Sequence, residues 1–348
     1  MSPSTWQAFN NNTALEAAVL TTSGSAALFS LVLTCYLVFR HLKHFVDAVA
    51  QRAIIRILLM VPFYATVSWL AILLGDYALY FKLVRDCYEA YVLYQFFSLI
   101  VYYTEKESPA HFKTRHYGIE KIMGPESIGQ LMTYYKETRF PFPLCCLSYQ
   151  PSNRVFQHIK RCSLQYVFVK PCLSAIAILL QILGLYHPGS FDYRYSYFWL
   201  VSIENISAAL ALFFIFMFYD LVKKVIEMHS PLMKLISIKI LVFFVFWQGI
   251  TVGLLYYFKV IPAFFSWSNE RSSETVQNVL ICMEMTGLSI FNLYAFPYIV
   301  YRTQPGEHTL DTALRNIQSV LSQKDVALDA VDAFHPDRLK HAIEKHTD

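Results

Sequence analysis

Charged residues are scarce in this sequence. Only 16% of its 348 residues are Asp, Glu, Lys or Arg, whereas 55% are hydrophobic and the mean hydropathy is +0.37. Soluble domains usually carry about 25% charged residues, so a water-soluble globule of this composition lacks much of the surface charge it needs. The high apolar content also excludes intrinsic disorder. The composition therefore predicts an integral membrane protein.

Enzyme and metal motifs are also missing. The sequence has no Gly-x-Ser-x-Gly, no Gly-x-x-x-x-Gly-Lys and no His-Glu-x-x-His, which mark common hydrolases, nucleotide-binding loops and zinc proteases. Its seven cysteines include no Cys-x-x-Cys pair, which argues against zinc ribbons and secreted disulfide scaffolds. The net charge of +4 is too small to indicate nucleic-acid binding. We expect no catalysis, no metal, no cofactor and no nucleic-acid partner.

Long apolar stretches predict the fold. Seven of them suit a hydrocarbon core about 30 Å thick, at 26–39, 54–74, 84–103, 164–185, 197–219, 235–258 and 276–301. Residues 1–23 contain no Lys or Arg, so the basic region of a cleavable signal peptide is absent. The sequence predicts an all-α polytopic membrane protein with seven transmembrane helices. It would comprise an outer segment (1–23), a transmembrane domain (24–301, with a cytoplasmic loop at 104–163) and a cytoplasmic tail (302–348) with an amphipathic helix.

The basic residues give this topology an orientation. With seven spans, the loops between them and the adjoining span ends place 17 lysines and arginines on one side of the membrane and five on the other. Lys and Arg are enriched in cytoplasmic loops. The count predicts the N-terminus outside and the C-terminus in the cytoplasm. Asn11 then begins an outer Asn-x-Thr glycosylation sequon.

Carboxylates inside the spans are the first candidates for function. Glu89, Glu204 and Glu284 lie at similar depth in the third, fifth and seventh spans. A charge inside a span costs about 2.5 to 3.5 kcal/mol on insertion scales, so the presence of each carboxylate requires an explanation. Three converging carboxylates would form a cation site or a polar contact for a substrate. Alternatively each is satisfied separately, with Arg85 one helical turn before Glu89 as its ion-pair partner.

Other polar residues in the spans extend the candidate set. Lys170 precedes Pro171 in the fourth span, and it either extends to the inner surface or faces a cavity and binds an anionic group. Neutral candidates for substrate or ion binding are Tyr94, Asn205, Gln248 and Asn292. Such side chains more often hydrogen-bond neighbouring helices than contact a ligand.

The cytoplasmic loop carries a possible lipidation site. Cys145 and Cys146 follow two prolines and lie among aromatic residues. Paired cysteines of this kind favour reversible palmitoylation. The alternative is a pair of buried reduced thiols.

Several motifs resemble one membrane-protein family. They are Val61-Pro62-x-Tyr64-x-x-x-Ser68-Trp69, Arg85-Asp86-Cys87-Tyr88-Glu89-Ala90, Gln165-Tyr166-x-x-x-Lys170-Pro171, Glu204-Asn205-x-Ser207, Trp247-Gln248-Gly249 and Cys282-Met283-Glu284-Met285. Together they are similar to the transmembrane protein 184 and organic solute transporter alpha-subunit family. The resemblance implies seven helices and, from the transporter branch, facilitated diffusion of bile acids and steroid conjugates with a single-span beta subunit. Cys145 and Cys146 match a family segment thought to be acylated.

Three functions are compatible with these observations. The leading hypothesis is a facilitative transporter of amphipathic organic solutes of the organic anion or steroid-like class. It would work among membrane lipids, as a homodimer or with a single-span partner subunit, in the plasma membrane or in a vacuolar, lysosomal or endosomal membrane. The second is a non-transporting endomembrane scaffold or trafficking protein. A seven-helix receptor is the third, disfavoured because no Asp-Arg-Tyr ends the third span.

Overall fold

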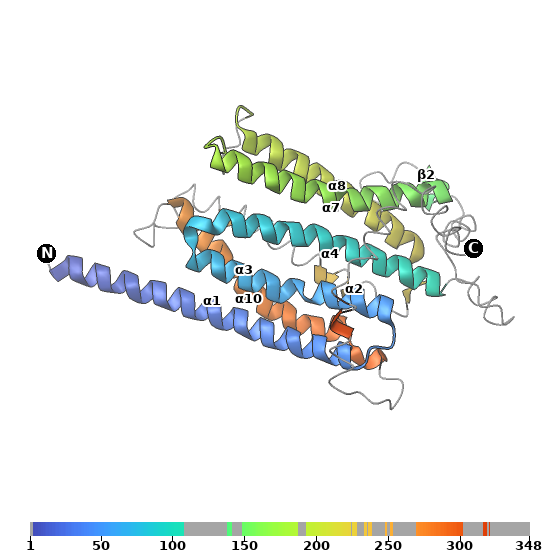
Figure 1. Ribbon diagram of the computed structural model, residues 1–348, viewed down its shortest axis with the longest axis horizontal. Coiled ribbons are helices and arrows are strands. Elements are labelled where there is room, and N and C mark those ends of the chain that lie inside the picture. Colours follow the sequence, from blue (N-terminus) through green and yellow to red (C-terminus); the bar gives the residue numbers. More distant parts are fainter. Residues whose placement is uncertain are drawn as a thin grey trace. The chain divides into compact units, whose positions relative to one another are not determined.

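Helices dominate the part of the chain that the structure describes. The computed structural model describes residues 3–107, 138–140, 148–186, 193–223, 225–227, 233–234, 236–238, 248, 251–252, 269–301, 316–318 and 320. Its helices are α1 (Pro3–Lys43), α2 (Ala48–Leu58), α3 (Met60–Leu73), α4 (Ala78–Glu107), α7 (Asn153–Ile182), α8 (Ser196–Val222) and α10 (Asn269–Ala295). Two 3₁₀ helices, η1 (Gly75–Tyr77) and η3 (Tyr298–Tyr301), and two short strands complete the set (Figure 1).

Five of the described helical segments are long and apolar enough to cross a membrane. They are Glu16–Lys43, Ala48–Leu73, Asn153–Ile182, Ser196–Val222 and Glu274–Tyr301. Each overlaps a predicted span, and together they confirm a multi-pass membrane protein. α4 matches the predicted third span in position, and its 30 residues are long enough to cross, but it carries several charges and is not among the five. The predicted sixth span lies almost wholly outside the described residues. Seven helices, and their orientation, stay predictions.

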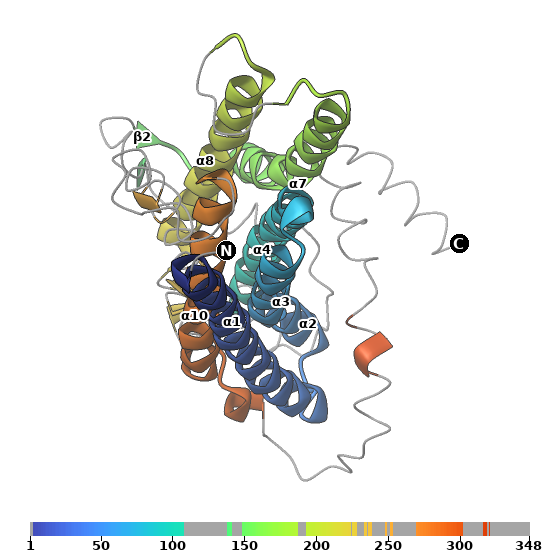
Figure 2. The same ribbon diagram turned by 90° about the vertical axis from the view of Figure 1, so that its left-hand side faces the viewer.

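Two compact units make up the chain. The first comprises Met1–Val46, Ile55–Glu89 and Leu232–Ala313. In it α1, α3 and α10 pack on one another in all three pairings, and Figures 1 and 2 both show them side by side. Gly24 allows α1 to approach α3, because a Cβ at this position would lie 2.9 Å from Trp69 Nε1. The Trp69 indole N–H donates to Leu20 C=O at 3.2 Å.

The second unit comprises Asp47–Ile54, Ala90–Pro231 and Leu314–Asp348. α7 and α8 form its main helix pair (Figure 1). Phe218 of α8 is fully buried, and its ring centroid lies 5.6 Å from those of both Phe97 of α4 and Phe156 of α7. The contact with Phe97 is edge-to-face and that with Phe156 is tilted, and such aromatic contacts supply packing without polar groups.

Prolines and hydroxyl residues set where the helices break or continue. Pro62 lacks the N–H that would bond to Leu58, and the helix is interrupted there between α2 and α3. Pro297 separates α10 from η3, whereas Pro171 lies inside a continuous α7. α1 begins well before the predicted span. Thr21, Thr22 and Ser23 hydrogen-bond carbonyls one turn back, at 2.6 to 2.8 Å, so these polar residues are compatible with the helix.

A short strand pair lies within the predicted cytoplasmic loop. β1 (Thr138–Arg139) pairs antiparallel with β2 (Ser148–Tyr149), with Thr138 opposite Tyr149. The Phe140 ring lies 4.7 Å from Tyr149 and 6.3 Å from Phe213 of α8, between ring centroids. Sequence patterns did not indicate this ladder. Cys145 and Cys146 follow β1 and lie outside the described residues, as does most of the predicted tail helix.

Candidate functional site

A buried ion pair joins α7 to α8. The Lys170 ammonium donates to Glu204 Oε1. Lys170 is only 2% exposed as a residue, whereas the Glu204 side chain is 31% exposed. Two residues that the sequence offered as separate candidates are therefore partners, and Lys170 is buried in this pair instead of extending to the surface. The two charges are therefore unequally buried, and the Glu204 carboxylate is the more accessible partner.

Local sequence places Lys170 at this depth. α7 begins after Ser152, whose hydroxyl accepts a hydrogen bond from the Val155 N–H at 3.4 Å and so acts as its N-cap. The helix starts about three turns before the predicted span, and Lys170 follows in its interior. Pro171 removes one backbone donor beside the lysine without ending the helix. Gly184 closes α7 with a φ of 69°, a conformation that glycine adopts readily.

A second polar contact lies in the first unit. The Gln248 Nε2 amide donates to Glu284 Oε1. The Gln248 carbonyl oxygen Oε1 and the second carboxylate oxygen, Glu284 Oε2, are buried and have no hydrogen-bond partner in the described part of the chain. Buried oxygens without donors are unfavourable unless a proton, a water or a ligand satisfies them. The amide of Gln248 is thus the observed partner of this glutamate.

Glu89 has a different neighbour. Tyr64 of α3, which is fully buried, donates its hydroxyl to Glu89 Oε2 at 3.0 Å. Arg85, one turn before Glu89, donates to Ser68 Oγ at 2.8 Å and to Asn278 Oδ1 at 3.3 Å rather than to Glu89. α4 is therefore linked by polar side chains to both α3 and α10.

The geometry of α10 separates the two glutamates of the first unit. Asn278 contacts Arg85, and Cys282 Sγ lies 3.5 Å from Ala65 C=O, so this face of α10 meets α3 and α4. Glu284 is two residues after Cys282, which rotates it by about 200° around the helix axis. Glu89 and Glu284 thus have different partners. Glu204 belongs to the second unit, and convergence of all three carboxylates stays a prediction.

The neutral candidates differ in their surroundings. Asn292 is buried and accepts a hydrogen bond from the Ser237 hydroxyl. Asn205 donates to Val201 C=O at 2.8 Å within its own helix. Tyr94 is buried in α4. Within the described ranges, no three His, Cys, Asp or Glu side chains are grouped closely enough to hold a metal ion. Asn11 lies within the helical bounds of α1.

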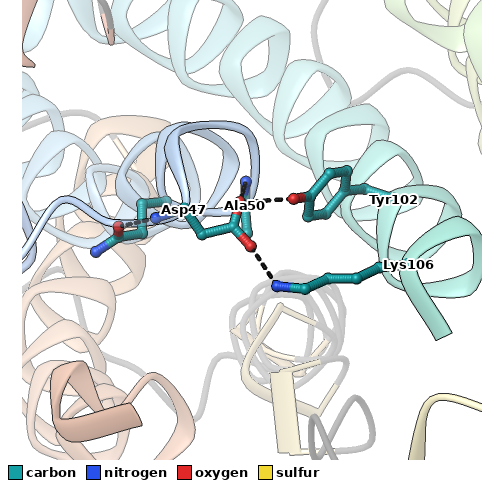
Figure 3. A network of polar contacts seen from close by, with 5 residues as sticks. Asp47, Ala50, Tyr102 and Lys106 are labelled. Atoms are coloured by element: carbon teal, nitrogen blue, oxygen red, sulfur yellow. Dashed lines mark hydrogen bonds and ion pairs between the residues drawn. The ribbon is translucent and has the colours of Figure 1, made fainter. Parts of the chain in front are cut away.

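A polar network around Asp47 was missed from the sequence (Figure 3). Its Oδ1 accepts the Ala50 N–H at 3.2 Å and the Tyr102 hydroxyl at 2.8 Å, and its Oδ2 pairs with Lys106 at 2.8 Å. The Asp47 N–H in turn donates to Gln51 Oε1 at 3.0 Å. An Asp before a helical stretch, with Gln four residues later, is a signal for a helix N-cap. The network connects the start of α2 with the last turns of α4.

Comparison with known proteins agrees with the sequence motifs. The chain matches the organic solute transporter Ostalpha family over residues 19–301. It is also similar to a transmembrane protein 184 homolog from Dictyostelium discoideum, with 31% identity over 285 residues. These cover 81% of this chain and 53% of the relative, so the chain spans about half the length of the curated relative that it matches. No solved structure matches it. The family match covers most of a chain with several apolar helices, and the chain belongs to the organic solute transporter Ostalpha family.

Proposed function

We propose that this chain moves amphipathic organic anions, such as steroid-like conjugates, across a membrane by facilitated diffusion. The observation that carries the proposal is the buried pair of Lys170 and Glu204 between two apolar helices. A lysine at this depth is stable only with an anionic partner. A solute carboxylate or sulfate has the same charge and acceptor oxygens as the Glu204 carboxylate.

Partner exchange gives this pair a role in transport. An organic anion that approaches Lys170 replaces Glu204, whose more exposed carboxylate turns toward water. Lys170 keeps an anionic partner throughout, so the exchange avoids the several kcal/mol that an unpaired buried charge costs. The apolar body of the solute contacts the surrounding aliphatic and aromatic side chains. No ion needs to move with the solute, which favours facilitated diffusion.

Flux in proteoliposomes tests the proposal. We expect Lys170→Met to lower the flux of a steroid sulfate about tenfold or more, because a charge-assisted hydrogen bond is lost, and to spare the flux of a neutral steroid. Glu204→Gln removes the internal competitor, so we expect it to lower the KM for the sulfate. A purely structural role would lower the flux of both solutes in both variants.

The matched control is a second ion pair on α8. Lys223 pairs with Asp220 at 2.6 Å, and both side chains are nearly half exposed. Lys223→Met and Asp220→Asn should leave the flux and the KM unchanged. Unaltered sulfate flux in Lys170→Met would refute the proposal. An absence of flux for every solute tested with the wild-type protein, with or without a single-span partner subunit, would favour a scaffold function instead.

A further inference from the structure

Cationic and aromatic side chains meet where α1 ends against η3. The Arg40 guanidinium donates through Nη2 to the Tyr298 hydroxyl at 2.6 Å, and its Cζ lies 4.3 Å from the centroid of the Tyr298 ring. The His44 ring stacks on Tyr298, with centroids 6.0 Å apart and planes 11° from parallel. We call Arg40, His41, His44, Lys234 and Tyr298 the α1–η3 cluster. All five belong to the first unit.

Three members of this cluster are buried, among them His44 at 8% exposed. His41 is fully buried, with Nε2 3.1 Å from Phe296 C=O. Lys234 is 6% exposed, and its Nζ lies 5.8 Å from the Phe296 ring centroid. The charged groups that act on His41 are Lys234 and His44, and both are of the cationic type. Burial lowers the pKa of Lys234 to about 8. The Arg40 guanidinium therefore lies in a cluster whose other basic groups are poorly hydrated.

Arg40 lacks an anionic partner. Its bond to Tyr298 is to a neutral phenol, its Nε is buried without a hydrogen-bond partner, and it pairs with no carboxylate in the described part of the chain. A guanidinium presents donors in a planar fork that matches the oxygens of a phosphate. The group is thus positioned to bind an anion that the described part of the chain does not supply.

The surroundings of Arg40 are apolar and exposed. Tyr36 and Phe39 lie on the last turns of α1, and Ile299 and Val300 lie on η3. All four side chains are exposed. In a membrane protein such side chains at a helix end face acyl chains or the interfacial region. A cationic group beside an apolar surface is complementary to a molecule with an anionic head and hydrocarbon tails.

We propose that the α1–η3 cluster binds an anionic phospholipid, with its phosphate at Arg40 and its acyl chains along Tyr36, Phe39 and the exposed residues of η3. The positive charge of Arg40 selects an acidic headgroup such as that of phosphatidylserine over zwitterionic phosphatidylcholine. Basic pockets between helices on the cytoplasmic side bind such headgroups, and the predicted orientation puts the end of α1 on that side. The lipid would fill a structural site separate from the Lys170–Glu204 pair.

Lipid-dependent thermal unfolding of the full chain tests this inference. The purified protein in detergent is titrated with phosphatidylserine, with phosphatidylcholine of the same acyl chains, and with inorganic phosphate. We expect phosphatidylserine to raise Tm more than the other two. Arg40→Gln should weaken the apparent affinity for phosphatidylserine about fivefold, as one basic residue near an acidic lipid surface does. Arg52→Gln is the matched control, because the Arg52 Nε donates only to its own helix backbone, at Ala48 C=O.

The outcomes separate the possible ligands. An equal loss of affinity for phosphatidylserine in Arg40→Gln and Arg52→Gln would mean that the lipid is attracted by general surface charge. That result would refute a specific site at Arg40. If inorganic phosphate raised Tm as much as the lipid does, the ligand of this site would be a free anion and the phospholipid proposal would be wrong. Should Arg40→Gln not fold, native mass spectrometry of the wild-type protein from mixed-lipid nanodiscs decides: retained phosphatidylserine supports the proposal, and retention in proportion to the bulk lipids refutes it.

Discussion

Removing either partner of the Lys170–Glu204 pair should destabilise the protein, but by unequal amounts. Glu204→Gln leaves an ammonium that is almost completely buried beside a neutral amide. Breaking a buried pair costs about 3 to 5 kcal/mol, and we expect about 3 here because the amide oxygen still accepts a hydrogen bond. Lys170→Met leaves a carboxylate whose side chain is 31% exposed. Water can hydrate it, so we expect about 1 to 2 kcal/mol.

The double variant measures how strongly the two charges depend on one another. Lys170→Met combined with Glu204→Gln removes both charges and leaves two side chains of similar volume. Replacing a buried pair in this way is often neutral or stabilising, so its stability should return to within about 1 kcal/mol of wild type. The coupling energy of the cycle is then about 4 to 5 kcal/mol. For the exposed Lys223–Asp220 pair the same cycle should give less than about 1 kcal/mol.

The assay is unfolding of the four proteins of each cycle in one detergent, without organic anions. Urea midpoints or Tm values rank the four proteins by stability. A greater loss of stability in Lys170→Met than in Glu204→Gln would refute the argument from unequal burial. A coupling energy as small as that of the exposed pair would show that the two charges do not depend on one another.

Three further predictions concern other parts of the fold. Gly24→Ala should destabilise by about 1 to 3 kcal/mol, because the added methyl group collides with the Trp69 indole. Asp47→Ala should cost about 2 kcal/mol through the lost N-cap and side-chain bonds, and amide exchange should rise in the first turn of α2. The pKa of Lys234 falls from 10.5 unfolded to about 8 folded, so the unfolded state binds more protons between these values. Stability should therefore rise as pH increases from about 8 to 10.5, as followed by thermal unfolding.

Each of these has a control within the chain. A Cβ at Gly287 meets no atom within 4 Å, so Gly287→Ala in α10 should be neutral or mildly stabilising, and equal losses at Gly24 and Gly287 would contradict the packing argument. Lys106→Met removes a half-exposed partner of Asp47 and should cost less than about 1 kcal/mol. The rise in stability with pH should vanish in Lys234→Met, and an unchanged pH profile would assign it to other groups.

Apolar runs allowed much of the helical arrangement to be predicted. Hydropathy located the described spans because a bilayer requires a continuous apolar stretch of about 20 residues. Their ends were less accurate. α1 and α7 begin earlier than predicted, because Thr21, Thr22 and Ser152 bond to nearby backbone groups and so fit within or at the start of a helix. Hydropathy does not register such local bonds.

Partners of the polar residues were harder to predict than the residues themselves. Glu89, Lys170, Glu204 and Glu284 stood out because a charge in a span calls for an explanation. Their pairing depends on helix rotation and on which helices are neighbours, and a single sequence contains neither. The Arg85 contacts illustrate this, because its hydrogen bonds reach α3 and α10 rather than the glutamate on its own helix.

The Lys170–Glu204 pair also has a consequence for how the protein enters its membrane. α7 and α8 are neighbours, and the predicted span within each (164–185 and 197–219) carries one charge that is unfavourable in lipid when alone. A lone central Lys or Asp adds about 2.5 to 3.5 kcal/mol to the insertion of a single helix. Entry of both helices together as a hairpin lets the charges neutralise one another before they leave the translocon. Biogenesis of this region is thereby expected to be a two-helix event, with α7 retained until α8 has been synthesised.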